Sequence, residues 1–349
     1  MEKINLIDLT KSELETEIEK LGAASFRAEQ IFNWLYDKKV FSFAKMTNLG
    51  QELQRKLAKH FQLNPLTKLG AQESTDGTIK YLFALADGAK IEVVYMPGRD
   101  GRKTLCVSTQ VGCAMGCSFC ATGLNGLTRD LKAGEIVNQV LTIEKLLEVE
   151  ISNIVLMGMG EPLDNYEASL KAVSLFNGPL NIGMRKITIS TCGVVPKIKE
   201  LAQENLQLTL AISLHAPNDE LRSNLIPINQ TYPLEELMAA CEYYIEQTNR
   251  RVTFEYALMA GINDRLEHAK QLADLLAGRL VHVNLIPINQ VDDLDYTKPQ
   301  ADVIADFKRE LQARNITVTL RKERGADIDA ACGQLQGKDE ELCLIWPVN

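Results

Sequence analysis

The stretch Thr104-Leu-Cys-Val-Ser-Thr-Gln-Val-Gly-Cys113-Ala-Met-Gly-Cys117-Ser-Phe-Cys120 joins a β-rich run to a loop with three closely spaced cysteines. Three thiolates can hold three corners of a cubane 4Fe-4S cluster, and the loop supplies no fourth, so one iron stays open to an outside ligand. A structural zinc site needs four Cys or His ligands, and the nearest histidines lie far away in the sequence. A disulfide with a spare thiol, or buried cysteines that act as small hydrophobes, are the alternatives.

Strand-like and helix-like segments alternate from this stretch onward. We expect strands at 104–109, 153–157, 186–190, 207–214, 251–258, 282–287 and 317–320, with helices such as 133–148, 234–247 and 301–314 between them. This order predicts a parallel sheet covered by helices, either open or wound into a full or partial barrel. Such α/β folds place functional residues after the strand ends. We therefore expect one rim to collect the cysteine loop, 158–161, Ser190, 213–215 and Asn289.

The residues before this region form two further parts. Thr10-Lys-Ser-Glu13 is a capping box, and the helical periodicity continues through expected helices at 26–37 and 51–61. Two β-rich runs at 78–85 and 90–96 flank Asp87-Gly88, which is a strong hairpin signal. We predict an N-terminal helical domain at 1–65, a β-hairpin linker at 66–102 and a main domain at 103–349.

The composition bounds the class of protein. A hydrophobic content of 46% with 24% charged residues is ordinary for a soluble globular protein. The N-terminus lacks the apolar core of a signal peptide, and no apolar run approaches the ~20 residues needed to cross a bilayer. We therefore expect a cytoplasmic protein with no membrane partner. Thiols are kept reduced there, so eight cysteines favour metal binding or redox catalysis over a disulfide framework.

The charge is unevenly distributed. The net charge of −8 offers no global attraction to nucleic acid. From Arg27 to Lys68, however, the sequence contains eight lysines and arginines but only three acidic residues. A local basic face of this kind can contact phosphates, although a solvated helical face explains the charge equally well.

Together these motifs resemble those of a radical S-adenosylmethionine (SAM) enzyme, in which Cys113-x3-Cys117-x2-Cys120 is followed by Gly158-Met-Gly-Glu161-Pro162. The whole chain further resembles the RNA adenine carbon-2 methyltransferase family, RlmN. The matching stretches are 104–108, 111–113, 157–163, 189–193, 213–217, 282–287 and Asp327-Ile-Asp-Ala-Ala-Cys332-Gly-Gln-Leu335. The resemblance implies a partial (βα)6-type radical SAM barrel, with an N-terminal helical domain that helps to grip RNA and a C-terminal catalytic-cysteine loop.

The chemistry of the substrate explains why such a family needs radicals. Carbon 2 of adenine is electron-poor and a poor nucleophile, so it cannot readily attack the methyl group of SAM. The resemblance implies that one SAM methylates Cys332, and that the radical from a second SAM abstracts hydrogen from this S-methyl group. The carbon radical then adds to carbon 2. Cys106 is implied to release the product through a transient disulfide, and Glu92 to act as the general base.

The resemblance also assigns the cofactor contacts. The implied cluster ligands are Cys113, Cys117 and Cys120, and the implied SAM contacts are Gly160, Glu161, Ser190, Ser213, Leu214, His215 and Asn289. Each has an ordinary alternative: a tight turn with a solvated carboxylate, a helix cap, or a structural histidine. Cys192, Cys241 and Cys343 are expected to be structural. Arg321-Lys-Glu-Arg324 can guide a phosphate or form a solvated loop.

Three functions are compatible with these residues. The first is carbon-2 methylation of adenine in 23S rRNA at the peptidyl-transferase centre and in certain tRNAs, with an electron donor such as flavodoxin or ferredoxin and its reductase. The related carbon-8 methyltransferase, Cfr, shares the cluster and both catalytic cysteines, but Pro162 favours the carbon-2 enzyme. The third is a noncatalytic iron-sulfur or zinc module that binds RNA. It leaves Cys332 and residues 158–161 unexplained.

Overall fold

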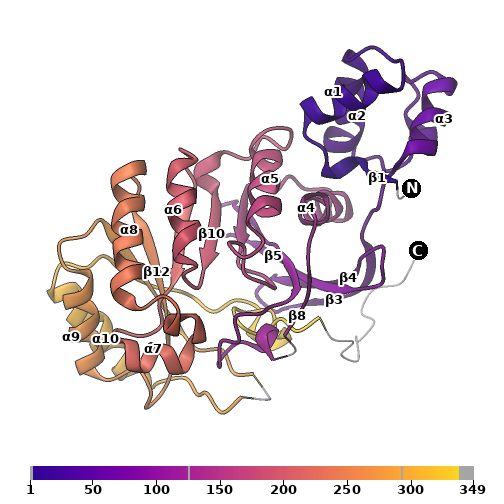
Figure 1. Ribbon diagram of the computed structural model, residues 1–349. Coiled ribbons are helices and arrows are strands. Elements are labelled where there is room, and N and C mark those ends of the chain that lie inside the picture. Colours follow the sequence, from indigo (N-terminus) through magenta and orange to yellow (C-terminus); the bar gives the residue numbers. More distant parts are fainter. Residues whose placement is uncertain (1–2, 125, 292–293, 338–349) are drawn as a thin grey trace.

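A computed structural model of the chain describes residues 3–124, 126–291 and 294–337 (Figure 1). Its main feature is a ten-stranded sheet. The order along the sheet is β14 (Val318–Leu320), β13 (Val281–Pro287), β12 (Val252–Leu258), β11 (Thr209–Ser213), β10 (Ile187–Thr191), β9 (Asn153–Leu156), β6 (Lys103–Cys106), β5 (Lys90–Pro97), β4 (Ile79–Ala84) and β3 (Thr67–Glu73). Within this sheet, β6 and the strands β9 to β14 all run parallel to one another.

Helices cover the outer face of the parallel strands (Figure 1). They are α4 (Ala133–Leu147), α5 (Tyr166–Asn177), α6 (Val195–Gln203), α7 (Asp219–Leu225), α8 (Leu234–Thr248), α9 (Leu266–Leu276) and α10 (Ala301–Ala313). The edge strands β14 and β3 do not pair with each other, so the sheet curves without closing. This confirms the partial barrel. β12 is buried at all seven positions, as expected for a parallel strand covered on both faces.

The hairpin predicted around Asp87-Gly88 continues the main sheet. Its strands β4 and β5 pair antiparallel, and Gly88 takes the positive φ of 86° that the turn requires. β5 also pairs antiparallel with β6, which is the first strand of the parallel part of the sheet. The additional strand β3 was not expected from the sequence, because its pattern has no strong β-branched run.

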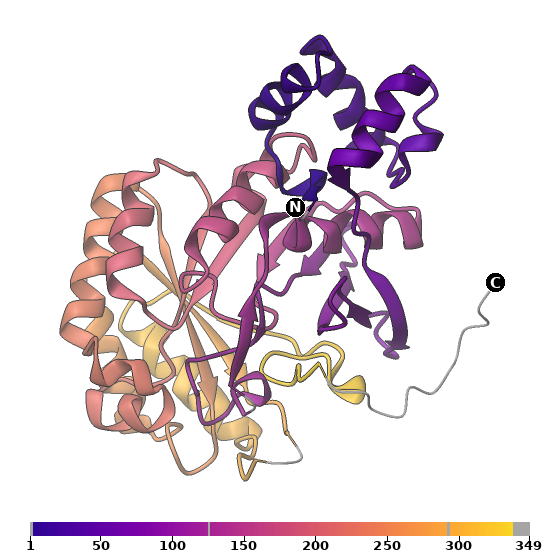
Figure 2. The ribbon, with the colours of Figure 1, turned by 45° about the vertical axis from the view of Figure 1, so that its right-hand side comes forward.

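The N-terminal helices lie beyond α4 and α5 at one end of the molecule (Figure 2). They are α1 (Lys11–Lys20), α2 (Phe26–Phe32), which continues into a π-helical turn (Asn33–Asp37), and α3 (Gln51–His60). The capping box of Thr10 and Glu13 is present as predicted. Asp8 fastens this part to the barrel, because its Oδ1 accepts a hydrogen bond of 2.7 Å from the Gly134 N–H of α4. The exact domain boundaries stay a prediction.

Short elements complete the description. β1 (Ile4–Asn5) pairs with β2 (Phe61–Gln62), and β7 (Gln110–Gly112) pairs with β8 (Leu127–Asp130) on either side of the cysteine loop. Single 3-10 turns occupy Leu6–Asp8, Phe43–Lys45, Ala121–Gly123, Met184–Lys186, Pro227–Gln230 and Ala326–Ile328. None of the helices in the described ranges has a stretch long and apolar enough to span a bilayer.

Candidate active site

The three cysteines of the loop after β7 line one cavity of about 160 Å³. The loop is fastened from two sides. The Ser118 N–H donates to the carbonyl of Leu225 in α7 at 3.0 Å, and the Ala121 N–H donates to the carbonyl of Gly333 at 2.7 Å. The second bond joins the loop to the segment that carries Cys332. Cys113, Cys117 and Cys120 therefore face a cavity whose walls come from several parts of the chain.

The donor set of this cavity fits an iron-sulfur cluster. The cysteines within the described ranges are all free thiols, and no three Cys, His, Asp or Glu side chains there converge on a single ion. Convergence on one point is not required, because each thiolate of a cubane binds its own iron. Burial raises the pKa of Cys113 to about 12, so the thiol keeps its proton at neutral pH unless a metal ion displaces it. Three sulfur ligands and no fourth suit a 4Fe-4S cluster with one open iron.

Two glycines after β9 allow the rim to pack tightly. Gly160 has a φ of 98°, and a Cβ there would lie 2.5 Å from the Cβ of Gln110. A Cβ on Gly158 would lie 2.7 Å from the carbonyl oxygen of Val107. No side chain fits at either position without moving the backbone. Both glycines therefore let their backbone pack closely against the chain after β6. They also line the cavity of the three cysteines, which we call the cofactor cavity.

Glu161 ties the ends of two strands together. Its carboxylate accepts hydrogen bonds from the backbone N–H of Cys192 at 2.8 Å and of Leu163 at 2.9 Å. The side chain is buried, and desolvation raises the pKa of this carboxyl group. Glu161 lines the cofactor cavity. Each carboxylate oxygen keeps a lone pair with which it can accept a further hydrogen bond from a ligand.

Ser190 and Ser213 line the same cavity at the ends of β10 and β11, and so does His215. Leu214 does not line it, because its side chain is fully buried in the core. Its N–H instead donates to the carbonyl of Glu255 at 3.0 Å. Leu214 can therefore take part in the site through its backbone position alone.

His215 is a neutral hydrogen-bond donor. Its Nδ1 accepts from the N–H of Ala257 at 2.8 Å, and burial, assisted by the charge of Arg222, lowers the pKa of the imidazole to about 3. The proton must then sit on Nε2. The ring packs edge-on against Phe119 of the cysteine loop, with the ring centroids 4.8 Å apart. This contact links the histidine to the cysteine loop.

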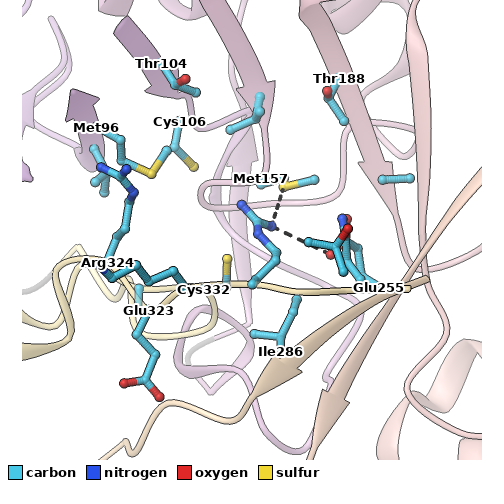
Figure 3. A pocket seen from close by; sticks show the side chains of 18 of the residues that line it. Met96, Thr104, Cys106, Met157, Thr188, Glu255, Ile286, Glu323, Arg324 and Cys332 are labelled. Carbon is cyan, nitrogen blue, oxygen red and sulfur yellow. Dashed lines mark hydrogen bonds and ion pairs between the residues drawn. The ribbon is translucent and has the colours of Figure 1, made fainter. Parts of the chain in front are cut away.

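A second cavity of about 480 Å³ adjoins the first and occupies the interior of the barrel (Figure 3). The wall between them is shared, since six residues line both cavities. They are Met157, Glu255, Ile286, Asn289, Arg321 and Cys332. A group bound in the first cavity is therefore separated from the second by a single layer of side chains.

Cys106 and Cys332 meet in this second cavity, although they come from β6 and from the loop after β14. Figure 3 shows their sulfur atoms pointing toward one another. Cys106 is buried and Cys332 is exposed. Burial raises the pKa of Cys106 to about 12, and the neighbouring Cys332 adds to this effect, while a hydrogen bond from Met157 and the charge of Arg321 oppose it. The two thiols form a pair in space.

Asn289 holds the loop of Cys332. Its Nδ2 donates to the Cys332 carbonyl at 3.2 Å, whereas its buried Oδ1 has no hydrogen-bond partner. The side chain is accessible from both cavities. Asn289 is thus placed between the cofactor cavity and Cys332, with one acceptor free for a ligand.

Glu92 contacts the loop of Cys332 but lines neither cavity. One carboxylate oxygen accepts from the backbone N–H groups of Gln336 at 2.6 Å and Gly337 at 2.9 Å, and the other lies 3.4 Å from Lys80 Nζ. Val94, two residues along the same strand face, does line the second cavity. The carboxylate therefore anchors the loop of Cys332 in this conformation.

Sequence reasoning missed an ion pair in the wall between the cavities. Arg321 Nη1 lies 3.7 Å from Glu255 Oε2 and 3.9 Å from Met157 Sδ, as the dashed lines in Figure 3 mark. Glu255 is buried and also accepts from the Asn284 amide at 2.9 Å. Arg321 lines both cavities, and its role as a phosphate guide stays a prediction. Only its place directly after β14 could have signalled the ion pair.

The remaining cysteines have structural surroundings. Cys241 is buried in the core of α8. Cys192 is also buried and borders the cofactor cavity, where its backbone N–H and carbonyl bind Glu161 and Arg222. Cys343 lies outside the residues that the structure describes.

Two family profiles match the chain. The profile described as "Radical SAM superfamily" matches residues 107–276, which include the cysteine loop and the rim residues as far as His215. The profile described as "Ribosomal RNA large subunit methyltransferase N-terminal domain" matches residues 4–63, which include α1 to α3.

Several known proteins are similar to this chain over nearly its full length. A probable dual-specificity RNA methyltransferase RlmN from Halalkalibacterium halodurans is 52% identical over 97% of this chain and 94% of its own length. A protein of the same name from Staphylococcus aureus is 49% identical over 98% of this chain and 95% of its own. The crystal structure of a radical SAM methyltransferase from Sphaerobacter thermophilus superposes with a TM-score of 0.92, at 48% identity over 96% of this chain and 100% of that one.

Proposed function

Because the chain belongs to the RlmN family of radical SAM RNA methyltransferases, we propose that it methylates carbon 2 of an adenine in 23S rRNA and in certain tRNAs. The observation that carries this proposal is the pair of thiols, Cys106 and Cys332, that face each other in the barrel next to the cavity lined by Cys113, Cys117 and Cys120 of the cysteine loop. The carbon-8 alternative is not favoured, since the similar proteins carry the name of the carbon-2 family.

Cys113, Cys117 and Cys120 would hold the 4Fe-4S cluster. Residues at the strand ends that border the same cavity would hold SAM, among them Gly160, Glu161, Ser190, Ser213, His215 and Asn289. When bound, the cluster and two SAM molecules per turnover supply an electron, a methyl group and a hydrogen-abstracting radical. Cys332 lines both cavities, so a group held in the first cavity would lie next to its side chain.

Cys332 is the residue that carries the methyl carbon. Its sulfur accepts the methyl group. This carbon then gives up a hydrogen atom to the radical that SAM would supply and becomes bonded to carbon 2 of the base, which joins enzyme and RNA covalently, and the one electron that the adduct must lose would return to the cluster. Glu92 removes the proton from carbon 2. The Cys106 thiolate attacks the Cys332 sulfur, so a disulfide forms and the carbon–sulfur bond breaks. The electron pair of that bond stays on carbon, which takes up a proton and becomes the methyl group of the product.

The remaining partners follow from this chemistry. The disulfide must be reduced before the next turnover, and the cluster needs an electron donor such as flavodoxin or ferredoxin with its reductase. The target base must leave its stack to enter the barrel, and the N-terminal helices would hold the RNA that is distorted in this way. We place the reaction in the cytoplasm, where its RNA substrates are.

Replacement of each thiol tests the proposal. Cys106→Ala should accumulate protein covalently bound to RNA, because the adduct forms but cannot be released. Cys332→Ala should form no adduct, and Cys241→Ala, which removes a buried core thiol, should behave as wild type. Denaturing gels detect the adduct, and mass spectrometry of digested RNA separates 2-methyl from 8-methyl adenosine. If the Cys106→Ala protein is free of RNA and methylates it normally, the two-thiol mechanism is wrong.

A further inference from the structure

Arg222, on α7, is a fully buried arginine that the chemistry above does not use. Within the described residues, its hydrogen bonds all go to neutral acceptors. Nε donates to the Leu214 carbonyl at 3.3 Å, and Nη1 donates to Asn229 Oδ1 at 2.9 Å. Nη2 donates to the carbonyls of Cys192 at 2.6 Å and Ser213 at 3.2 Å. The guanidinium thus gathers the backbone at the ends of β10 and β11.

This buried positive charge has no direct counter-charge in the part of the chain that the structure describes. Among the residues that the structure describes, no carboxylate forms an ion pair with Arg222. Asp219 comes nearest through a chain of contacts, since it accepts from the Asn229 amide at 2.9 Å. An unpaired buried charge is costly, and burial accordingly lowers the pKa of Arg222. Peptide carbonyls satisfy its donors but do not neutralise it.

The cofactor cavity lies next to this charge. Cys192 and Ser213, whose carbonyls bind Nη2, both line it. The last residue of α7, Leu225, accepts the N–H of Ser118 in the cysteine loop at 3.0 Å. Cys117 packs against the apolar cluster that includes Leu225. A negatively charged Cys117 would raise the pKa of Arg222, so the guanidinium and the sulfur ligand lie within reach of each other's field.

We propose that Arg222 is the buried counter-charge of the cluster held by the cysteine loop and that it favours uptake of the electron. A cubane bound by three thiolates carries a net negative charge, and reduction adds another. A fixed positive charge in a buried site favours the more negative, reduced form. Arg222 acts through its charge and not by contact with the cluster. The inference rests on the proposed function, because it needs the cluster to be present.

The test measures the reduction potential of the cluster in the full-length reconstituted protein, by a titration followed with electron paramagnetic resonance and without RNA. Arg222→Gln removes the charge and should shift the potential to more negative values. Arg222→Lys keeps the charge and should stay close to wild type, although it cannot form the same four hydrogen bonds. Asn229→Ala is the matched control, because it removes one acceptor of Arg222 without changing any charge, and it should also stay close to wild type.

Two results would overturn the inference. One is a wild-type potential in Arg222→Gln, and the other is a shift in Arg222→Lys as large as that in Arg222→Gln, which would assign the effect to hydrogen bonds. If Arg222→Gln yields no folded protein, Arg222→Lys and Asn229→Ala decide: a much larger shift in the lysine variant contradicts the role of charge.

The failure of this inference can be told apart from the failure of the proposed function. A wild-type protein that takes up no iron, or that binds iron but does not cleave SAM, refutes both. A wild-type protein that cleaves SAM while the charge variants share its potential refutes only the role of Arg222. As a second measure, the fraction of iron retained under a chelator should fall several-fold in Arg222→Gln and remain near wild type in Asn229→Ala.

Discussion

The amide of Asn289 donates a hydrogen bond of 3.2 Å to the carbonyl of Cys332 and so joins the rim of the cofactor cavity to the reactive cysteine. Asn289→Ala removes the donor without adding a charge. A net hydrogen bond is worth about 0.5–1.5 kcal/mol, so we expect methylation of the Cys332 sulfur to slow about two- to twelve-fold. Mass spectrometry of the S-methyl group after single-turnover reactions measures this rate. An unchanged rate would show that the bond does not position Cys332.

Glu92 can act as a base, as an anchor of the Cys332 loop, or as both. Glu92→Gln keeps one oxygen that can accept from the N–H groups of Gln336 and Gly337, but it cannot take up a proton. We expect S-methylation of Cys332 near the wild-type rate, while RNA methylation falls by about 10²–10⁴-fold, the usual range for loss of a general base. Methylated adenosine and methylated Cys332 are quantified in the same samples.

A matched variant separates the two roles of Glu92. Lys80→Gln removes the cation 3.4 Å from the carboxylate and leaves the carboxylate itself in place. It should affect RNA methylation far less than Glu92→Gln. If Glu92→Gln also abolishes methylation of Cys332, the carboxylate is needed to hold the loop, and the assignment as a base loses its support.

His215 should make the protein sensitive to acid. Burial holds its pKa at about 3, below the ordinary value of the unfolded chain of about 6.5. Between these values the unfolded chain binds a proton that the folded chain does not, so stability is full above about pH 6.5 and is lost as the pH falls toward 3. From pH 7 to pH 5 this single site accounts for a loss of about 2 kcal/mol in the free energy of unfolding.

The variant His215→Asn removes this titration with little change in geometry. Asparagine can place an oxygen where Nδ1 accepts from Ala257, and it tolerates the positive φ of 55° at this position. Guanidinium unfolding of the cluster-free protein at both pH values should show a loss that is smaller by about 2 kcal/mol than in wild type. Equal losses in the two proteins would mean that the fold does not lower the pKa of His215.

Gly160 should be indispensable for the packing of the rim even without SAM. Gly160→Ala meets both a positive φ of 98° and a Cβ contact of 2.5 Å with Gln110. Gly261→Ala is the control, because Gly261 has a φ of 73° and open space around it. The control should cost about 1–2 kcal/mol from backbone strain alone, and Gly160→Ala about 1–3 kcal/mol more from overpacking. Denaturant unfolding of the cluster-free proteins compares them, and equal costs would contradict the steric argument.

The fold was predictable from the sequence where the periodicity is strong. The parallel strands and the helices α4, α8 and α10 lie within a few residues of their predicted positions, because apolar β-branched runs alternate there with amphipathic segments. Local sequence fails where packing decides. Asn-Leu-Ile-Pro-Ile-Asn-Gln is the end of α7 and a 3-10 turn at 224–230, but the same seven residues form β13 and its exit at 284–290. The neighbouring strand, not the heptapeptide, determines the second conformation.

Part of the candidate site was likewise predictable from the sequence, and part was not. The cysteine loop is contiguous, so its spacing alone suggested a cluster. The ion pair of Glu255 with Arg321 and the isolated charge of Arg222 could not be predicted. Both depend on burial and on partners that are distant in the sequence. A charged residue on a short helix reads as solvated until the fold shows that water is excluded from it.

The basic face of the N-terminal helices provides the last prediction. Some of its charges are used within the protein, since Lys39 pairs with Glu144 at 3.2 Å. Arg55 and Lys59 differ: they lie four residues apart on α3, so they share one helix face, and both are exposed. Neither has an ion pair within the described residues. These two side chains are therefore free to contact phosphates.

Charge reversal at both positions, Arg55→Glu with Lys59→Glu, should weaken RNA binding and reduce its dependence on salt. Each lost phosphate contact lowers the slope of log affinity against log salt by about 0.7–0.9, so the double variant should lower it by about 1.4–1.8. The control reverses Lys199 and Arg309, which are exposed on α6 and α10, and changes the net charge equally. Binding to an RNA hairpin is measured from low to moderate salt. Equal weakening in both double variants would mean that net charge alone, and not this face, attracts the RNA.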